Sequence, residues 1–178
     1  MNIQATTQAV HHITSDALLV AAARKSAGQG EKGVQLSPAA ASVDELLGGL
    51  ILERAADGEF KGNLGELLTI HPMGRLAVKR VIVVGLGTPE KITTQAIRRA
   101  SSTAARHLQN TGAQQITLAL NWDSNNYDAA QGVQAEVEGV LLGLYTFRIY
   151  QNKENNGQNI SQLQVLTDDA HKAESEQA

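Results

Sequence analysis

The 178-residue chain has no cysteine and few aromatic residues, and each shortage restricts what it can be. The absence of cysteine excludes disulfides and thiolate metal sites, and it fits a reducing compartment. Phe, Trp and Tyr supply 3% of the residues, whereas 42% of all residues are apolar. The core is therefore expected to consist of Leu, Val, Ile and Ala side chains.

Long hydrophobic runs and a strong net charge are missing as well. No stretch of about 18 apolar residues could span a bilayer. The N-terminus, MNIQATTQAVHH, has neither the basic nor the apolar region of a signal peptide. The formal net charge of -3 gives no electrostatic reason to expect a nucleic acid or an acidic membrane as partner. We therefore expect a cytoplasmic protein.

What the sequence does contain is an alternation of strand-like and helix-like segments. Apolar runs predict strands within residues 3–10, 16–23, 63–70, 81–84, 115–120 and 163–167. Helical spacing predicts helices that begin near Ser42 and near Thr93 or Thr94, and a third helix over residues 129–147. Residues 24–38 are expected to form a loop, because they contain several glycines and a proline and show no periodicity.

The first predicted helix depends on a capping pattern. Ser42 and Glu45 have the Ser-x-x-Glu spacing of a capping box. The apolar face behind this cap would consist of Leu46, Leu47, Leu50 and Ile51. Gly48 and Gly49 would lie inside the helix, where close packing on a sheet would explain them.

The order of these segments indicates the fold class. From residue 79 onward the order is strand, helix, strand, helix, strand, which is typical of a parallel sheet with right-handed crossovers. The turn HPMG (71–74) would join an antiparallel pair. The expected fold is therefore α/β, a three-layer sandwich with a mixed, largely parallel sheet flanked by helices. Residues 1–167 would form one domain, and the polar residues 168–178 a tail at the start of an interdomain linker.

The stretch VIVVGLGTPEKI raises the question of a phosphate-binding loop. Gly85 and Gly87 match a dinucleotide fingerprint, but Glu90 stands where its third glycine belongs. A Walker loop fails as well, because Glu90 takes its second glycine position and Ile92 its Ser/Thr position. The interpretation favoured is a tight turn between a buried strand and its helix.

Other chemical motifs are weak. The five histidines lack the spacing of a metal site and are His11, His12, His71, His107 and His171. The adjacent carboxylates Asp44/Glu45 and Asp168/Asp169 are expected at a helix start and in the tail. The basic residues Lys79, Arg80, Arg98, Arg99 and Arg106 are expected to be mostly solvated. No catalytic, cofactor-binding or metal-binding residue is predicted.

Two aromatic residues leave one possibility open. Trp122 and Tyr127 lie in the polar segment NWDSNNYD. They could mark a contact surface, or they could fold back onto their own domain.

Two long segments resemble the N-terminal domain of the leucyl aminopeptidases (cytosol aminopeptidases). They are KRVIVVGLGTPEKITTQAIRRASSTAARHLQNTGAQQITLAL and VEGVLLGLYTFRIYQNKE. The upstream segments SDALLV, DELLGGLI and FKGNLGELLTI follow in the same order, so the resemblance covers residues 3–167. It implies a macrodomain-like fold within a parent enzyme that removes N-terminal amino acids from peptides. It also implies a hexamer in which this domain has an assembly or access-shaping role.

The resemblance places the chemistry elsewhere. Family members carry two divalent metal ions, zinc or manganese, in a C-terminal catalytic domain whose metal-binding segments are absent from this sequence. The chain alone is therefore expected to be non-catalytic, with its own catalytic domain and sister subunits as partners, and peptide substrates only in the full-length enzyme. The alternative is a macrodomain-like module that binds ADP-ribose or another nucleotide near Gly85–Gly87, at a strand end where ligands of open α/β sheets bind. A nucleic-acid role through the arginine-bearing helix is a third, weaker hypothesis.

Overall fold

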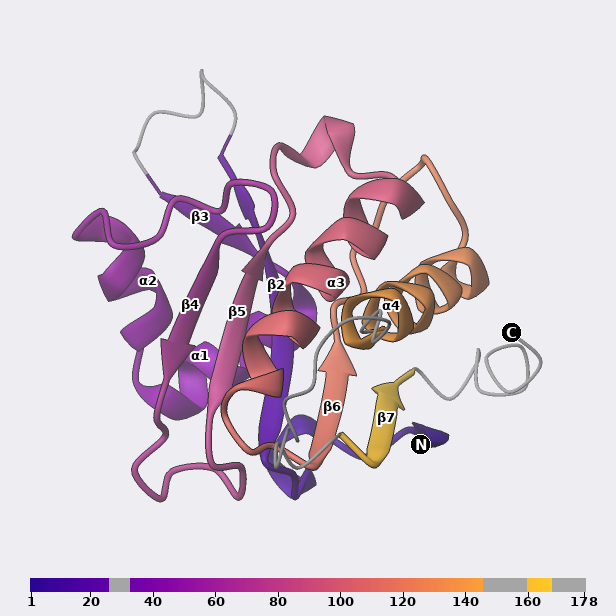
Figure 1. Ribbon diagram of the computed structural model, residues 1–178. Helices are drawn as coiled ribbons and strands as arrows, with labels where there is room; N and C mark the ends of the chain where they lie inside the picture. Colours follow the sequence, from indigo (N-terminus) through magenta and orange to yellow (C-terminus); the bar gives the residue numbers. More distant parts are fainter. Residues whose placement is uncertain (26–32, 146–159, 168–178) are drawn as a thin grey trace.

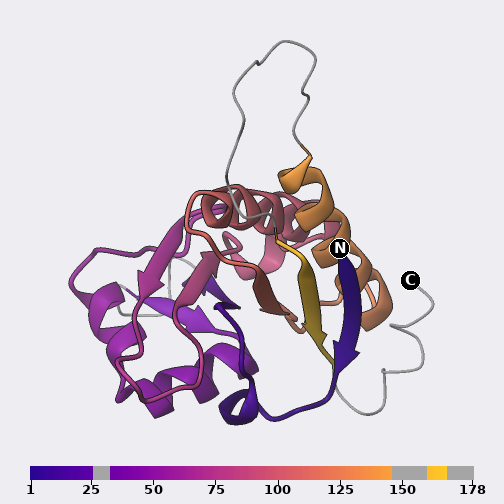
Figure 2. The same ribbon diagram turned by 60° about the horizontal axis from the view of Figure 1, so that its bottom comes forward.

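The computed structural model describes residues 1–25, 33–145 and 160–167. Within them a seven-stranded mixed sheet is covered by helices on both faces, as Figures 1 and 2 show. The strands are β1 (Asn2–Thr6), β2 (Ala17–Arg24), β3 (Val34–Leu36), β4 (Leu67–Ile70), β5 (Val81–Gly85), β6 (Gln115–Ala119) and β7 (Gln162–Leu166). The helices are α1 (Pro38–Leu47), α2 (Leu50–Ala56), α3 (Thr94–Gln109) and α4 (Ala129–Leu144), with short 3-10 turns η1 (Val10–His12) and η2 (Pro89–Lys91).

The sheet topology confirms the predicted α/β class. The strand order is β1-β7-β6-β2-β5-β4, and β3 pairs with β2 beside this path. The five strands β1, β7, β6, β2 and β5 run parallel, whereas β4 on β5 and β3 on β2 are antiparallel. The antiparallel pair expected around residues 71–74 is therefore confirmed. The loop predicted for residues 24–38 is wrong in part, because three residues of β3 are too few for a periodic pattern to show.

Strand β2 lies at the centre and divides the core in two. Its alternate side chains Leu19 and Ala21 face the layer of α3 and α4, whereas Leu18 and Val20 face α1 and α2. All four are fully buried. A strand that is covered on both faces has a continuous apolar sequence, which is why this segment could be predicted so directly.

The start of the first helix differs from the prediction. Ser37 is the N-cap of α1 and accepts a hydrogen bond from the amide of Ala40 at 3.2 Å, with Pro38 in the first turn. The expected cap, Ser42, lies inside the helix and donates to the carbonyl of Pro38. Proline favours the first helical position because its missing N–H would have no partner there. The Ser37–Pro38 pair was therefore the stronger start signal.

The predicted helix is also two helices. Gly48 and Gly49 both have positive φ angles (77° and 84°), so the chain turns between α1 and α2. Asp44 is 4% exposed near the end of α1, and its carboxylate accepts a hydrogen bond from the amide of Ile51 at 2.7 Å. The expectation that Asp44 begins a helix is wrong, because this side chain instead caps the helix that follows.

The second half of the chain matches the prediction closely. Thr93 caps α3 and accepts a hydrogen bond from the amide of Ala96, and Asp128 forms a capping box with Gln131 at the start of α4.

Helix α4 approaches α3 very closely. A side chain at Gly139 would collide with the carbonyl oxygen of Arg98. This close approach fixes α4 over the ends of β6 and β7.

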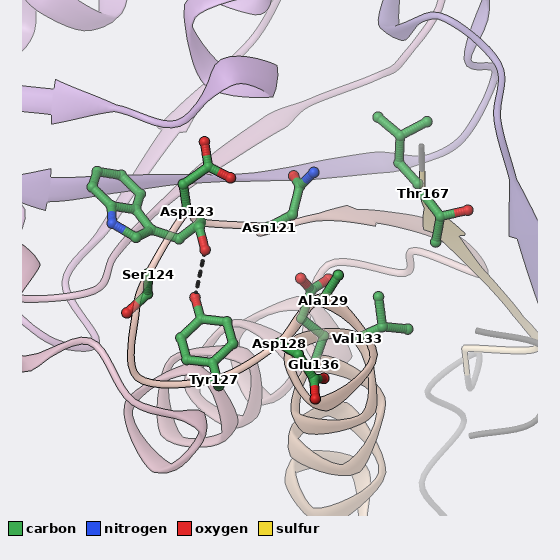
Figure 3. Close-up of a pocket in the computed structure, with 12 residues that line it drawn as sticks. Asn121, Asp123, Ser124, Tyr127, Asp128, Ala129, Val133, Glu136 and Thr167 are labelled. Carbon is green, nitrogen blue, oxygen red and sulfur yellow. Dashed lines mark hydrogen bonds between the residues drawn. The ribbon is translucent and has the colours of Figure 1, made fainter. Parts of the chain in front are cut away.

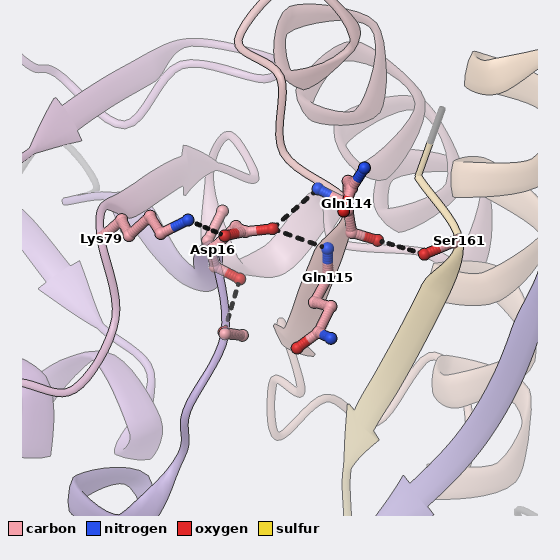
Figure 4. A network of polar contacts seen from close by, with 7 residues as sticks. Asp16, Lys79, Gln114, Gln115 and Ser161 are labelled. Atoms are coloured by element: carbon pink, nitrogen blue, oxygen red, sulfur yellow. Dashed lines mark hydrogen bonds and ion pairs between the residues drawn. The ribbon is translucent and has the colours of Figure 1, made fainter. Parts of the chain in front are cut away.

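At the amino-terminal ends of the strands, the carboxylate of Asp16 connects β2 with the starts of β5 and β6 (Figure 4). Asp16 lies 2.6 Å from the ammonium of Lys79 and accepts from the amides of Gln114 and Gln115 at 2.8 and 3.0 Å. The hydroxyl of Ser161 also donates to the carbonyl of Gln114. Partial burial tends to raise the pKa of Asp16, but these donors outweigh it and lower the pKa to about 2.

Candidate functional site

The Gly85–Gly87 turn is a filled surface. The amides of Gly85 and Gly87 donate to the carbonyls of Glu66 and Gly62, and the amide of Leu86 donates to β2. A side chain at Gly85 would collide with the carbonyl oxygen of Asn63. Because a phosphate loop works through free backbone amides, this turn cannot cradle a phosphate in the conformation described.

A pocket does lie at the carboxyl ends of β6 and β7, beside the first turns of α4 (Figure 3). Its volume is about 170 Å³. The β6–α4 connection supplies most of the wall, and α4 and the end of β7 supply the rest. The lining residues are Asn121, Trp122, Asp123, Ser124, Tyr127, Asp128, Ala129, Gly132, Val133, Glu136, Leu166 and Thr167.

Three buried oxygen atoms of this lining have no hydrogen-bond partner among the described residues: Asn121 Oδ1, Glu136 Oε2 and Thr167 Oγ1. They come from the end of β6, the middle of α4 and the end of β7 (Figure 3). Glu136 is 1% exposed and Thr167 is 6% exposed. Leaving a buried polar atom unpaired costs about 1–3 kcal/mol. Oxygen atoms of this kind around a pocket indicate a site where water or a ligand supplies the missing partner.

Burial controls the charge of the pocket. It raises the pKa of Glu136 to about 8, against the opposing effect of a hydrogen bond from the amide of Leu120. Burial and then the charges of Glu136 and Asp123 raise the pKa of Tyr127 as well. The hydroxyl of Tyr127 donates to the carbonyl of Trp122 at 2.8 Å. Glu136 is therefore mostly protonated at neutral pH, and Tyr127 is uncharged.

The pocket combines carboxyl groups with apolar side chains, and its lining contains no His, Lys or Arg. The structure thus offers a small, acidic, partly apolar pocket that suits recognition.

The aromatic residues of the β6–α4 segment fold back onto the domain. Trp122 is 8% exposed and belongs to the core under α3 and α4. Tyr127 packs against the same core. Of the two interpretations left open, the one in which Trp122 and Tyr127 fold back onto their own domain is confirmed.

The remaining predicted residues are not brought together into a site. His11, His12, His71 and His107 are all exposed. His171, Asp168 and Asp169 lie outside the described residues.

The basic concentration is divided between separate ion pairs. Lys79 binds Asp16 at 2.6 Å, and Arg98 binds Glu138 at 2.6 Å, which ties α3 to α4. Arg99 and Arg106 are exposed on α3.

Sequence reasoning missed Glu136, although a signal was present. In the helix predicted over residues 129–147, Val133 and Val140 belong to the apolar face, and Glu136 has the three- and four-residue spacing that places it on the same face. A carboxylate on an apolar stripe is buried unless the helix turns it away, so it marks a perturbed group.

Comparison with known proteins identifies the family. The family model described as "Cytosol aminopeptidase family, N-terminal domain" matches residues 17–154. The chain belongs to the cytosol aminopeptidase family. A probable cytosol aminopeptidase of Alkaliphilus metalliredigens is 32% identical over 130 residues, which is 72% of this chain and 26% of the relative. A probable cytosol aminopeptidase of Streptomyces griseus is 37% identical over 147 residues, or 80% of this chain and 26% of the relative.

Solved structures show the same fold. A mutant of the tomato leucine aminopeptidase superposes with a TM-score of 0.73 at 20% identity, covering 99% of this chain and 35% of that one. A Trypanosoma brucei macrodomain in complex with ADP-ribose superposes with a TM-score of 0.69 at 15% identity, covering 99% of this chain and 68% of that one. The macrodomain-like architecture of this aminopeptidase N-terminal domain is thereby confirmed. The chain spans about a quarter of the length of the two curated aminopeptidases.

Residues 1–25, 33–145 and 160–167 contain no group of three or more His, Asp or Glu side chains that could hold a metal ion. In the same residues, no helix has both the length and the apolar character needed to cross a membrane.

Proposed function

We propose that the chain is the non-catalytic N-terminal domain of a metal-dependent aminopeptidase whose parent enzyme removes N-terminal amino acids from peptides. The observation that carries this proposal is the family match over residues 17–154. The lack of a metal-ligand cluster within the described residues supports it, because a two-metal site needs clustered ligands on a rigid frame. Zinc or manganese would then be bound in another part of the parent enzyme. The names of the relatives support a cytoplasmic location.

The lack of catalysis is tested with the purified 178-residue chain and leucyl-p-nitroanilide in the presence of manganese. We expect no turnover above the metal-only reaction. A cytosol aminopeptidase of full length serves as the positive control under the same conditions. Metal-dependent hydrolysis that copurifies with the chain would contradict the proposal.

The role of the domain would be in assembly or in shaping access to the catalytic site. Exposed apolar side chains at the end of α4 support such a contact role: Leu141, Leu142 and Tyr145 are 44%, 60% and 73% exposed. The expected partners are the catalytic domain and sister subunits of a hexamer.

The two roles separate when the catalytic part of a relative is produced with and without this domain fused to it. If the domain is needed for assembly, the catalytic part without it should form a smaller oligomer. If the domain shapes access to the catalytic site, the number of subunits in the oligomer should stay the same, and the ratio of long-peptide to dipeptide hydrolysis should change. Identical size and identical ratio would contradict both roles.

ADP-ribose binding is the second candidate, and the likeness to the macrodomain fold favours it. The charges oppose it, since Asp123 and Asp128 line the pocket and would repel a diphosphate. Calorimetry with ADP-ribose tests this candidate. Saturable heat would support it, and its absence at millimolar ligand would end it.

A further inference from the structure

We propose that strand β1 is the interface of a symmetric homodimer, in which two copies of this chain pair their β1 strands antiparallel and join their sheets into one. Strand β1 ends the strand order, and among the described residues only β7 pairs with it. Figure 2 shows β1 (indigo) on the outer side of β7 (yellow). The other side of β1 is therefore an open sheet edge, which another strand can extend. The proposal does not rest on the aminopeptidase assignment.

The open edge of β1 presents the backbone groups of Ile3 and Ala5. The amide of Asn2 donates to the residue just before β7 at 2.8 Å, and the carbonyl of Thr6 accepts from the residue just after β7 at 2.9 Å. The N–H and C=O groups of one strand residue point to the same side, and successive residues alternate between the two sides. The even-numbered residues of β1 therefore face β7, and the N–H and C=O groups of Ile3 and Ala5 point away from it.

These outward groups are complementary to a second copy of the same strand. When the strands run antiparallel with Gln4 opposite Gln4 of the second copy, Ile3 lies opposite Ala5 of the second copy. Residues opposite each other at such a position exchange both of their N–H···O bonds. The two-fold axis repeats this exchange, so every outward backbone group of Ile3 and Ala5 gains a partner. A contact of this kind uses the same patch on both copies and closes at a dimer.

The side chains of this edge permit the pairing. Charged side chains and proline usually protect an edge strand from other chains, and residues 1–10 contain neither. Gln4 is exposed and would meet its own copy at the two-fold axis, where a charged side chain would repel itself. The outward groups are thus placed symmetrically about a neutral residue, which favours a second copy of this chain over an unrelated strand.

One apolar side chain adds to the contact. Ile3 lies beside Leu163 in the β1–β7 register, on the face of the sheet that α3 and α4 cover, and it is 43% exposed. In the antiparallel register it would lie across from Ala5 of the second copy, which would cover part of it. A strand of five residues buries less than the roughly 1,200 Å² of a stable interface. We therefore expect a weak dimer, with a dissociation constant of about 0.1–1 mM.

The first test is the mass of the purified 178-residue chain in solution, measured by analytical ultracentrifugation at concentrations below and above this dissociation constant. We expect the average mass to rise with concentration from that of one chain towards that of two chains and no further, because the contact closes at two copies. A monomer at every concentration would overturn the proposal, and so would growth beyond two chains.

A backbone variant tests whether β1 is the interface. Ala5→Pro removes the outward N–H of Ala5 and leaves the bonds to β7 in place, since proline is tolerated where the N–H of an edge strand faces solvent. It should abolish dimerisation while the midpoint of urea unfolding stays close to that of the wild type. Ala5→Ser keeps the N–H and is the matched control, which should dimerise like the wild type. Unchanged dimerisation of Ala5→Pro would overturn the proposal.

Charge variants of Gln4 test the antiparallel register without altering the backbone. Gln4→Lys and Gln4→Glu each place like charges on the two-fold axis and should weaken their own homodimers several-fold. An equimolar mixture of the two should form a heterodimer that is tighter than either homodimer, because opposite charges then face each other. Amide NMR with one variant labelled detects it through shifts of the β1 residues. Gln8→Lys, at an exposed position beyond β1, is the matched control and should dimerise like the wild type. Homodimers of unchanged affinity, or variants that do not pair on mixing, would refute the register and with it the proposal.

Discussion

At the scale of single residues, Glu136 gives the stability of this domain an unusual pH dependence. Its pKa is about 8 in the folded chain, against an ordinary pKa of 4.5 for a glutamic acid side chain. Between these values the folded state holds a proton that the unfolded state has lost, so the free energy of unfolding falls as pH rises. The contribution is complete below pH 4.5 and is lost as pH rises through 8.

We therefore predict that the free energy of unfolding is lower at pH 9 than at pH 5, by at most about 5 kcal/mol from this group. Urea unfolding at pH 5, 7 and 9 measures the difference. Glu136→Gln should flatten the profile and be the more stable protein at pH 9, because an amide of the same shape needs no proton to stay neutral. Parallel pH profiles for the wild type and Glu136→Gln would show that another group is responsible.

Asp16, at the amino-terminal end of the central strand β2, has the opposite effect on stability. Its pKa of about 2 lies below the ordinary pKa of 3.8 for an aspartic acid side chain, so its contribution to stability is present above pH 4 and is lost as pH falls through 2. Asp16→Asn should cost about 1–2 kcal/mol at pH 7, since Lys79 is exposed and water screens part of the ion pair. Chemical unfolding at pH 7 and pH 2.5 tests this. The difference in stability between the variant and the wild type should shrink at pH 2.5, and a constant difference would contradict the electrostatic explanation.

At the scale of secondary-structure elements, the contact between α3 and α4 positions the pocket. Gly139 faces the carbonyl of Arg98, and Gly143 faces the backbone of Ser102. Glu136 lies one turn before Gly139, so its burial against β6 depends on this close approach. A shift of α4 away from α3 would open the pocket.

Replacing Gly139 with alanine should therefore destabilise the chain. The added methyl group would collide with backbone, which costs about 1–3 kcal/mol and exceeds the helix-propensity gain of alanine over glycine, about 1 kcal/mol. Thermal unfolding measures the effect, and Leu142→Ala, at a position that is 60% exposed on the same helix, should change stability by less than about 0.5 kcal/mol. Equal melting temperatures for Gly139→Ala and the wild type would contradict the packing described.

The elements that could be predicted share one property: their pattern is long or strongly apolar. The β5 run after Arg80 and the helix capped by Thr93 follow directly from periodicity. The β3 strand could not be predicted, because its three residues are defined by pairing with β2. The division of the first predicted helix into α1 and α2 at Gly48 could not be predicted either, because a local pattern does not show whether a glycine interrupts a helix or lies within it. The pocket was missed because its oxygen atoms come from three elements that meet only after folding.

At the scale of the whole molecule, the sheet is completed by a short segment near the end of the described chain. Strand β7 lies between β1 and β6 and pairs with both. Leu163 and Val165 on this strand are buried in the core beneath α4. The integrity of one side of the domain therefore depends on residues 160–167.

Two truncations test the proposed domain boundary at residue 167. A chain that ends at Thr167 should unfold at the same urea concentration as the full chain, because residues 168–178 contain no large aliphatic side chain. A chain that ends at Asn159 should lose several kcal/mol or fail to fold, since it lacks the three buried aliphatic side chains of Ile160, Leu163 and Val165 and the partner of β1. Circular dichroism and urea titration measure both. Loss of stability on removal of residues 168–178 alone would place the boundary further on.

The position of β7 also sets the order in which a ribosome can complete this fold. Strand β1 is the first to be synthesised, and its sheet partner is β7, about the last. At about 5–20 residues per second, β1 waits roughly 10–30 s before its partner leaves the exit tunnel. During that time β6 has no neighbouring strand on the side that β7 later occupies, and the end of β7 does not yet line the pocket beside Asn121. The nascent domain therefore acquires its helices and central strands first, and the pocket at the ends of β6 and β7 only after β7 has been synthesised.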